Sequence, residues 1–219
     1  MPMSAYISRT STNDPLGDED YQGERWSIAM TKRPETDEEL AALLVSGTVT
    51  PQNATIPIFP YDPEWPRQYA VEERKIRAAL GEGVVVLEHV GSTSIPSMPA
   101  KPIIDILLAV KDSAREGTYV PALTAQGYRL HLREPAWEEH RLMKGADPDV
   151  NLHVFTAGSN EIKRMLVFRD RCRANPEEHE LYERTKTELA RQVWRHVQHY
   201  ANAKGDVVEA IISRALPDL

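Results

Sequence analysis

The stretch Glu88–Val110, EHVGSTSIPSMPAKPIIDILLAV, decides the fold of this chain. One apolar segment ends in a Gly-Ser pair, and three prolines lead into a second apolar segment whose only acid is Asp105. Short, β-branched and nearly continuously apolar segments are typical of strands covered on both faces. We therefore predict two central strands, over Val84–Val90 and Pro102–Val110, joined by a Gly-Ser turn.

Asp105 is the chemically unusual residue of the second strand. Side chains alternate along a strand, so Asp105 shares one face with Leu107 and Ala109, whereas the other face is wholly apolar. An ionised carboxylate in such surroundings is costly unless it meets a cation, a hydrogen-bond donor or water. Two interpretations stay open at this point, an ion pair with Lys101, which precedes the strand, and a metal ligand.

The flanking sequence predicts the rest of the fold. Apolar residues recur at helical spacing in Trp65–Leu80, and Gly81 stands where a left-handed helix cap is expected. The order of elements predicts an α/β (α+β) fold, a small mixed sheet flanked by helices with a helical C-terminus. The other predicted elements are a helix over Arg115–Gln126, strands over Tyr128–Arg133, His140–Lys144 and Val150–Thr156, and helices over Glu161–Arg173, Glu177–Tyr200 and Asp206–Leu216.

Composition narrows the class of protein. The 219 residues are 41% hydrophobic and 27% charged, close to the average of soluble globular domains. Lys and Arg total 26 against 33 Asp and Glu, a net charge of −7 that disfavours nucleic acid as a partner. The single Cys172 excludes a disulfide framework, and the sequence shows neither a membrane span nor a leader. We therefore expect a cytoplasmic protein.

The first 55 residues differ from the remainder. They are rich in Ser, Thr and Pro and hold nine acidic residues against four basic ones. Within them, Thr36–Val45 has a capping residue, an acidic first turn and an apolar run, which predicts one short helix. We divide the chain into an acidic, mostly irregular extension over 1–55 and a folded domain over 56–219. The amphipathic segment Glu178–His199 suits packing on this domain or on a second copy in a homodimer.

Ionisable residues beside the central strands are candidates for acid–base chemistry. His89 and His153 have side chains that titrate near neutral pH, so each is a base, a metal ligand or a packed structural residue. The structural interpretation is favoured for His89 and the functional one for His153. Glu88 lies in a sheet-centre strand, where an acid is expected to meet Lys or Arg.

Although the net charge is negative, several basic residues are candidates for binding an anionic ligand. Arg169 continues the apolar stripe of its predicted helix, which places a guanidinium on the buried side. A buried arginine needs an anion, so Arg169 pairs either with a carboxylate such as Asp170 or Asp62, or with a ligand phosphate or carboxylate. The basic candidates for a ligand site are Lys101, Arg133, Arg141, Lys144 and Arg169.

Four segments together resemble the signature segments of the GrpB family, in the same order. They are PYDPEWP (60–66), HVGSTSIPSMPAKPIID (89–105), NLHVF (151–155) and MLVFRDRCRANPE (165–177). The resemblance runs from about Ile56 to Leu216. It implies a nucleotidyltransferase-like fold, in which a Gly-Ser turn holds the phosphates of a nucleoside triphosphate and strand carboxylates hold magnesium. A similar domain is attached to some dephospho-coenzyme A kinases.

Applied to this sequence, the resemblance implies a role for each candidate residue. Gly91 and Ser92 are expected to hold phosphate, Asp105 the metal, and the basic candidates the remaining negative charge, with His153 as base. The sequence departs from the pattern at Leu107, where a second acid is expected on the face of Asp105. A third acid on the later strand is also missing, and Asn151 and His153 occupy that face instead.

The expected function is therefore a magnesium-dependent nucleotidyltransferase, or another enzyme that uses a nucleoside triphosphate and acts on a small-molecule acceptor. Two alternatives stay open. One is metal-independent acid–base or condensation chemistry on a small carboxylate substrate, with Glu88, His89 and His153 as the ionisable set. The other is a module that binds a nucleotide or another ligand without turnover.

Overall fold

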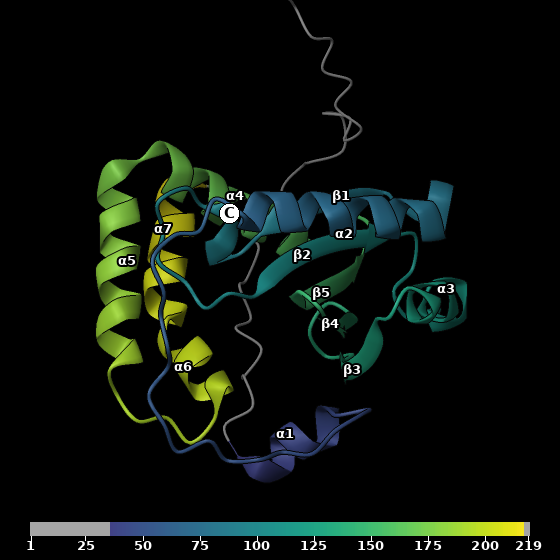
Figure 1. Ribbon diagram of the computed structural model, residues 1–219, viewed down its shortest axis with the longest axis horizontal. Coiled ribbons are helices and arrows are strands. Elements are labelled where there is room, and N and C mark those ends of the chain that lie inside the picture. The colour runs from purple at the N-terminus through teal and green to yellow at the C-terminus, as the bar shows by residue number, and fades with distance from the viewer. Residues whose placement is uncertain (1–35, 217–219) are drawn as a thin grey trace, which may run out of the picture. The chain divides into compact units, whose positions relative to one another are not determined.

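A computed structural model describes residues 36–216 of the chain (Figure 1). They form a five-stranded mixed sheet with helices, which confirms the predicted α+β fold class. The predicted extension before residue 36 lies outside the described residues. Within the described part, no helix has both the length and the apolar character needed to span a lipid bilayer.

The sheet has the strand order β1-β2-β5-β4-β3. β2 and β5 are parallel neighbours, and the other three neighbouring pairs are antiparallel. The predicted strands at both ends of the Gly-Ser turn are therefore adjacent, and β5 joins them from far along the chain. The strands are β1 (Val86–Val90), β2 (Ile104–Val110), β3 (Arg129–Glu134), β4 (His140–Ala146) and β5 (Asp149–Thr156).

The two faces of β2 pack against different helices, as the alternation of its side chains predicts. Ile104, Ile106 and Leu108 join the main core with residues of α2 (Trp65–Leu80) and α3 (Val120–Ala125). The opposite face carries Leu107 and Ala109, which pack with residues of β5 and α4 (Asn160–Ala174). Asp105 lies on this second face, at the edge of its apolar cluster.

The C-terminal helices form a separate layer that packs on α4 and on the loop after the Gly-Ser turn. They are α5 (Pro176–Ala190), α6 (Val197–Ala203) and α7 (Gly205–Ala215), and Figure 1 shows α5 and α7 side by side. The single helix predicted over Glu177–Tyr200 is wrong. Residues 191–196 interrupt it, because the backbone of Trp194 pairs with that of Ala54 and cannot continue the helical hydrogen bonds.

The predicted helix over Arg115–Gln126 is also divided. A short 3-10 helix, η3 (Glu116–Thr118), precedes α3, and Pro121 lies in the first turn of α3. Proline is tolerated in a first turn but clashes with a preceding helical turn, so the α-helix begins there.

Residues 36–59 pack onto the rest of the described chain, through contacts with the edge strand β3, with residues 190–195 and with Ala100. The predicted short helix is confirmed as α1 (Asp37–Leu43), with a capping box between Thr36 and Glu39. Leu44 forms a bridge with Leu132 at the edge strand β3, so this part of the chain covers an otherwise unpaired sheet edge. Figure 1 shows α1 below β3.

Candidate functional site

The Gly-Ser turn brings the backbone directly against Asp105. Gly91 has a φ of 67°, and a Cβ atom there would lie 2.3 Å from Oδ2 of Asp105. The following 3-10 helix, η2 (Ser92–Ser94), is tied to the chain before β2 because the Thr93 hydroxyl donates to the carbonyl of Ile103 at 3.0 Å. Only glycine fits at position 91 without displacing the carboxylate.

Asp105 is held by β5 yet remains open to solvent. Asn151 lies opposite it in the parallel pair and donates its Nδ2 hydrogen to Asp105 Oδ1 at 2.7 Å. Nε2 of His153 lies 3.7 Å from the same oxygen, and 27% of the Asp105 side chain is exposed. Burial alone would raise the pKa of Asp105, but His153, Asn151 and Lys101 together hold it below its ordinary value. The carboxylate is therefore ionised at neutral pH.

Lysines surround this carboxylate without forming an ion pair with it. Lys144 donates to Oδ1 of Asn151. In residues 36–216, neither Lys101 nor Lys144 lies within 4 Å of a carboxylate oxygen. The ion pair between Asp105 and Lys101, one of the two early interpretations, is thus not formed. The pKa of Lys101 is lowered, first by burial and then by repulsion from Lys204 and Lys144.

Two further lysines that were not predicted come from the C-terminal region, Lys186 in α5 and Lys204 between α6 and α7. Lys186 of α5 is buried, and its ammonium donates to the carbonyl of Pro99 at 2.6 Å. Burial and the charge of Lys204 lower the pKa of Lys186 to about 7, although Asp105 acts in the opposite direction. Lys204 lies over the ring of Tyr200, 4.5 Å from its centroid.

A sequence signal for Lys186 does exist. It follows Tyr182 and precedes Ala190 by four residues each, and all three are buried on the same side of α5. A lysine in line with buried residues along one side of a helix predicts an ammonium group that lies inside the folded protein. The position of Lys204, between two helices, offers no comparable pattern.

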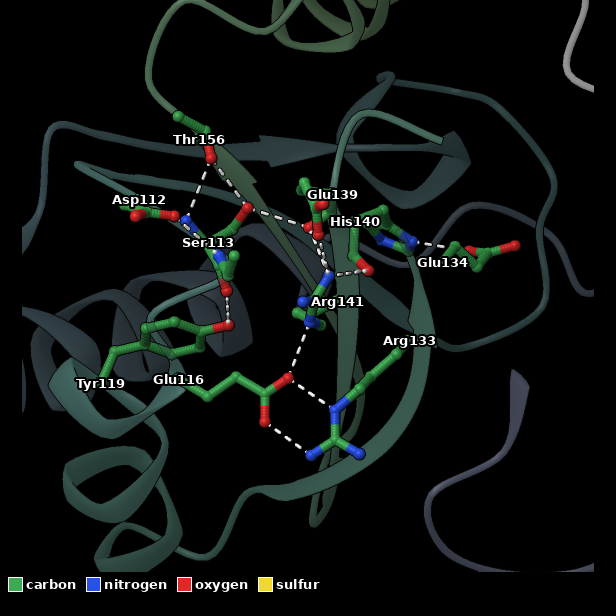
Figure 2. A network of polar contacts seen from close by, with 11 residues as sticks. Asp112, Ser113, Glu116, Tyr119, Arg133, Glu134, Glu139, His140, Arg141 and Thr156 are labelled. Carbon is green, nitrogen blue, oxygen red and sulfur yellow. Dashed lines mark hydrogen bonds and ion pairs between the residues drawn. The ribbon is translucent and has the colours of Figure 1, made fainter. Parts of the chain in front are cut away.

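Two histidines and a glutamate extend the site behind Asp105. Nδ1 of His153 lies 3.1 Å from Nε2 of His140, and Nδ1 of His140 lies 2.7 Å from an oxygen of Glu134. His140 and Glu134 were not predicted. Figure 2 shows the contact between Glu134 and His140 at one end of this chain of side chains.

Glu88, His89 and Arg169 form contacts of a structural kind. His89 lies on the opposite face of β1 from Glu88, stacked on Tyr69 and within 3.1 Å of the Thr93 hydroxyl. Burial lowers the pKa of His89 to about 4, so it is neutral. Glu88 accepts from Arg169 at 2.8 Å, as the expected pairing with a basic residue requires.

Arg169 has one of its predicted carboxylate partners. Its Nε donates to Asp170 at 2.7 Å, and it also donates to the backbone carbonyl of His89 at 3.0 Å. These contacts join α4 to β1 and occupy most of the donors of the guanidinium.

Arg133 and Arg141 are paired with acids away from Asp105. Both donate to Glu116, Arg133 through two bonds of 2.6 Å and Arg141 through one of 2.7 Å (Figure 2). Arg141 lies on the face of β4 opposite to Lys144, and it also donates to Glu139. Of the basic candidates, the structure therefore brings only Lys101 and Lys144 to the carboxylate.

The position of the expected second acid is closed. Leu107 is fully buried and packs with Val90, Ala109 and Phe155. Across the described ranges, no group of three or more His, Cys, Asp or Glu side chains is placed to hold a metal ion. The site offers a single carboxylate with lysines around it and an imidazole beside it.

The fold and this site define an α+β protein with a Gly-Ser turn against a strand aspartate. The GrpB protein family model matches residues 55–214, and the chain therefore belongs to the GrpB family. The chain is 54% identical over 182 residues to the UPF0157 protein BH1888 of Halalkalibacterium halodurans. The aligned residues make up 83% of this chain and 93% of that protein. The resemblance seen in the sequence is confirmed.

Other known proteins are similar over part of the chain. The crystal structure of conserved protein GrpB from Enterococcus faecalis superimposes with a TM-score of 0.65 and 28% identity, covering 74% of this chain and 98% of that one. A dephospho-CoA kinase of Mycolicibacterium paratuberculosis is 31% identical over 150 residues, 57% of this chain and 37% of the kinase. The poly(U) polymerase Cid1 has a TM-score of 0.39 and 14% identity, a likeness that identifies neither activity nor ligand.

Proposed function

We propose that this GrpB protein is an enzyme that binds a nucleoside triphosphate beside Asp105 and transfers a group from it to a small acceptor. The observation that carries the proposal is the excess of lysines over acids around one partly exposed carboxylate. Among residues 36–216, no carboxylate lies within ion-pair distance of Lys101, Lys144 or Lys186, and such charges are costly in a folded protein without an anion. A polyphosphate is the anion that several lysines suit.

Two features of the turn support phosphate as the bound group. Gly91 keeps side-chain atoms away from the space against Asp105, and Ser92 adds a hydroxyl at the same turn. The Ser92 hydroxyl lies 3.4 Å from that of Tyr182, so its hydrogen bond there is weak and can be exchanged for a ligand oxygen. A bound anion would also favour the protonated form of Lys186 and raise its lowered pKa.

Magnesium fits this site as one ion and not as two. Magnesium takes oxygen ligands and is commonly held by one or two carboxylates together with substrate phosphates. Asp105 supplies one carboxylate, and the buried Leu107 supplies no ligand where a second acid is needed. An ion held by Asp105 would neutralise phosphate charge. The transfer of a proton from the acceptor falls to His153, whose Nε2 lies 3.7 Å from Oδ1 of Asp105.

A second candidate function is metal-independent acid–base chemistry in the same place. It is favoured by the chain of Glu134, His140, His153 and Asp105, which can move or hold a proton without a metal. Its ionisable set differs from the expected one, because His89 is packed on Tyr69 and Glu88 pairs with Arg169. Activity that survives a strong chelator would favour this candidate.

Thermal unfolding and calorimetry with each nucleoside triphosphate, with and without magnesium, test the proposal. Ligands that bind only the native state stabilise it, by about 2.7 kcal/mol at one hundred times the Kd. We expect one triphosphate to raise the unfolding temperature, and Asp105→Asn to lose the part that depends on magnesium. Asp112→Asn is the matched control, since this partly exposed carboxylate accepts from the backbone N–H of Ala114 and an amide oxygen can replace it.

Two results would reject the proposal. One is that no triphosphate stabilises the protein at any magnesium concentration. The other is that Asp105→Asn binds as the wild type does, which removes the metal role of Asp105. Tight binding combined with no labelled product from any acceptor would instead favour a binding module without turnover.

A further inference from the structure

Three side chains from neighbouring strands lie in one row beside the Gly-Ser turn. In the strand pairing, Asn151 of β5 is opposite Lys144 of β4 on one side and opposite Asp105 of β2 on the other. Directly opposite residues share one face of a sheet, so the three side chains stand next to one another, and each is partly exposed. The row therefore runs from a cation through an amide to an anion.

The chemistry of its neighbours fixes the orientation of the Asn151 amide. A lysine ammonium only donates hydrogen bonds, so the amide oxygen must face Lys144. The amide NH₂ group then faces Asp105 and donates to its Oδ1 at 2.7 Å. The reverse orientation would set donor against donor at Lys144 and acceptor against acceptor at Asp105. Both contacts therefore hold Asn151 in the same position.

Without this amide, Lys144 and Asp105 would be free to neutralise each other. Strands that are second neighbours in a sheet lie about 9–10 Å apart, a gap that the four-carbon stem of a lysine and an aspartate side chain can bridge together. Opposite charges attract more strongly at a partly buried site than in water. No contact within 4 Å joins the two charged groups in the structure, because the amide of Asn151 lies between them.

Both charged groups keep unused bonding capacity on either side of the amide. Among the described residues, Asn151 is the only hydrogen-bond partner of Lys144, whose ammonium has three donors. Asn151 and His153 both approach Oδ1 of Asp105, whereas Oδ2 lies against Gly91 and accepts from no described residue. Lys144 can therefore donate to an anion, and Oδ2 of Asp105 can coordinate a cation.

We infer that Asn151 is a positioning residue that prevents an ion pair between Lys144 and Asp105, so that Lys144 binds a phosphate oxygen while Asp105 holds a divalent cation. The inference rests on the proposed function and adds to it a residue that acts through its two neighbours. An ion pair formed in the free protein would have to break before a ligand could bind. Keeping the two charges apart therefore preorganises the site.

Manganese binding to the whole chain, without nucleotide, tests the inference. Manganese prefers the same oxygen ligands as magnesium, and its free concentration is measured by electron paramagnetic resonance. We expect Asn151→Ala to weaken manganese binding about tenfold, because Lys144 then pairs with Asp105. Adding Lys144→Met to this variant should restore binding, since methionine carries no charge. Asn160→Ala is the matched control and should bind as the wild type does, because Asn160 begins α4 beyond the opposite end of β5.

Lys144→Met alone shows what the lysine charge does while Asn151 is in place. It should change manganese binding by less than about threefold, so that the larger recovery in the double variant reports the ion pair. Equal effects of Lys144→Met with and without Asn151 would overturn the inference. A double variant that stays as weak as Asn151→Ala would also overturn it, because Asn151 would then hold the cation itself.

Two further measurements decide the matter even if Asn151→Ala fails to fold. Asn151→Ser keeps a small polar side chain but removes the amide, so it should lose manganese binding and regain it with Lys144→Met. The wild type should bind manganese alone, and in a chelator it should bind inorganic tripolyphosphate in calorimetry. A wild type that binds neither probe would overturn the inference, because its two charges would then be neutralised.

Failure of this inference can be told apart from failure of the proposed function. If no nucleoside triphosphate binds while Lys144→Met still rescues Asn151→Ala, the proposed function is rejected and the role of Asn151 stands. If a triphosphate binds but Lys144→Met gives no rescue, the role of Asn151 alone is rejected.

Discussion

Two groups of basic residues on the same sheet have opposite surroundings. Arg133 and Arg141 share Glu116, and their donors are directed at carboxylate oxygens within 2.7 Å. On the other face of β4, Lys144 meets an amide, and Lys101 has no acid within ion-pair distance in the part of the chain that the structure describes. The paired arginines join strands and loops of the fold, and the lysines without an acid partner among residues 36–216 are the ones to which the proposed function assigns an anionic ligand.

The difference also explains the kinds of residue used. Arginine presents a planar fork that matches a carboxylate, as the two bonds from Arg133 to Glu116 show. Lysine carries a compact charge on a flexible stem, and its pKa shifts readily on burial, as in Lys101 and Lys186. The residues beside Asp105 are lysines, and in the proposed function their flexible stems adapt to a ligand that binds and dissociates.

Gly91→Ala should have the largest effect on nucleotide binding, because the change lies directly against Asp105 and leaves the arginine pairs with Glu116 intact. A positive φ costs a residue with a side chain about 1–3 kcal/mol, and here the new Cβ would also meet Asp105. We expect a lower unfolding temperature and complete loss of magnesium-dependent nucleotide binding. Gly81→Ala is the control, since Gly81 also has a positive φ but open space around its Cβ position. Equal binding in both variants would contradict the close approach.

Glu116→Gln should lower the free energy of unfolding by about 1–3 kcal/mol, because the buried Arg141 loses one of its two carboxylate partners and keeps only Glu139. The hydrogen bonds from Arg133 and then Arg141 hold the pKa of Glu116 below its ordinary 4.5. A lowered pKa stabilises the fold above the unfolded value, and this is lost as the pH falls through the folded value. The gap between wild type and variant in urea unfolding should therefore close below about pH 4.5. A constant gap, or weakened nucleotide binding at neutral pH, would refute the assignment.

Lys144→Gln and Arg133→Gln should separate the two groups with the smallest changes. Loss of one charged hydrogen bond to a ligand is worth about 1.4 kcal/mol, so Lys144→Gln should weaken triphosphate binding about tenfold in calorimetry. Its unfolding free energy should change by less than about 0.5 kcal/mol. Arg133→Gln should lower stability by under about 1 kcal/mol and leave binding intact, because the pair is partly exposed. The reverse pattern would mean that the roles of the two groups are exchanged.

Local patterns in the sequence predicted the strands and the turn correctly. The alternation in β2 placed Asp105 and Leu107 on one face, and the structure has Leu107 in the apolar cluster of that face. The Gly-Ser pair marked the turn that approaches Asp105. These features depend on neighbours along the chain, since side-chain direction alternates with each residue of a strand.

Errors in the sequence analysis arose where distant segments meet. The long helix after residue 176 is interrupted because Trp194 pairs with Ala54, 140 positions earlier in the chain. Arg133 and Arg141 looked equivalent to Lys144 as ligand groups until Glu116 proved to be their neighbour. His140 was overlooked because its contact with His153 depends on the pairing of β4 with β5.

By itself, the sequence determined the family, the α+β class and the strand aspartate that follows a glycine turn, because these depend on spacing within short segments. Only the tertiary structure decided which charges are paired. Strand order and helix packing set the distances between side chains far apart in the chain, and electrostatic interactions depend on those distances. Lys186 shows this clearly, since it lies 81 residues from Asp105 in sequence yet its charge acts on the same site.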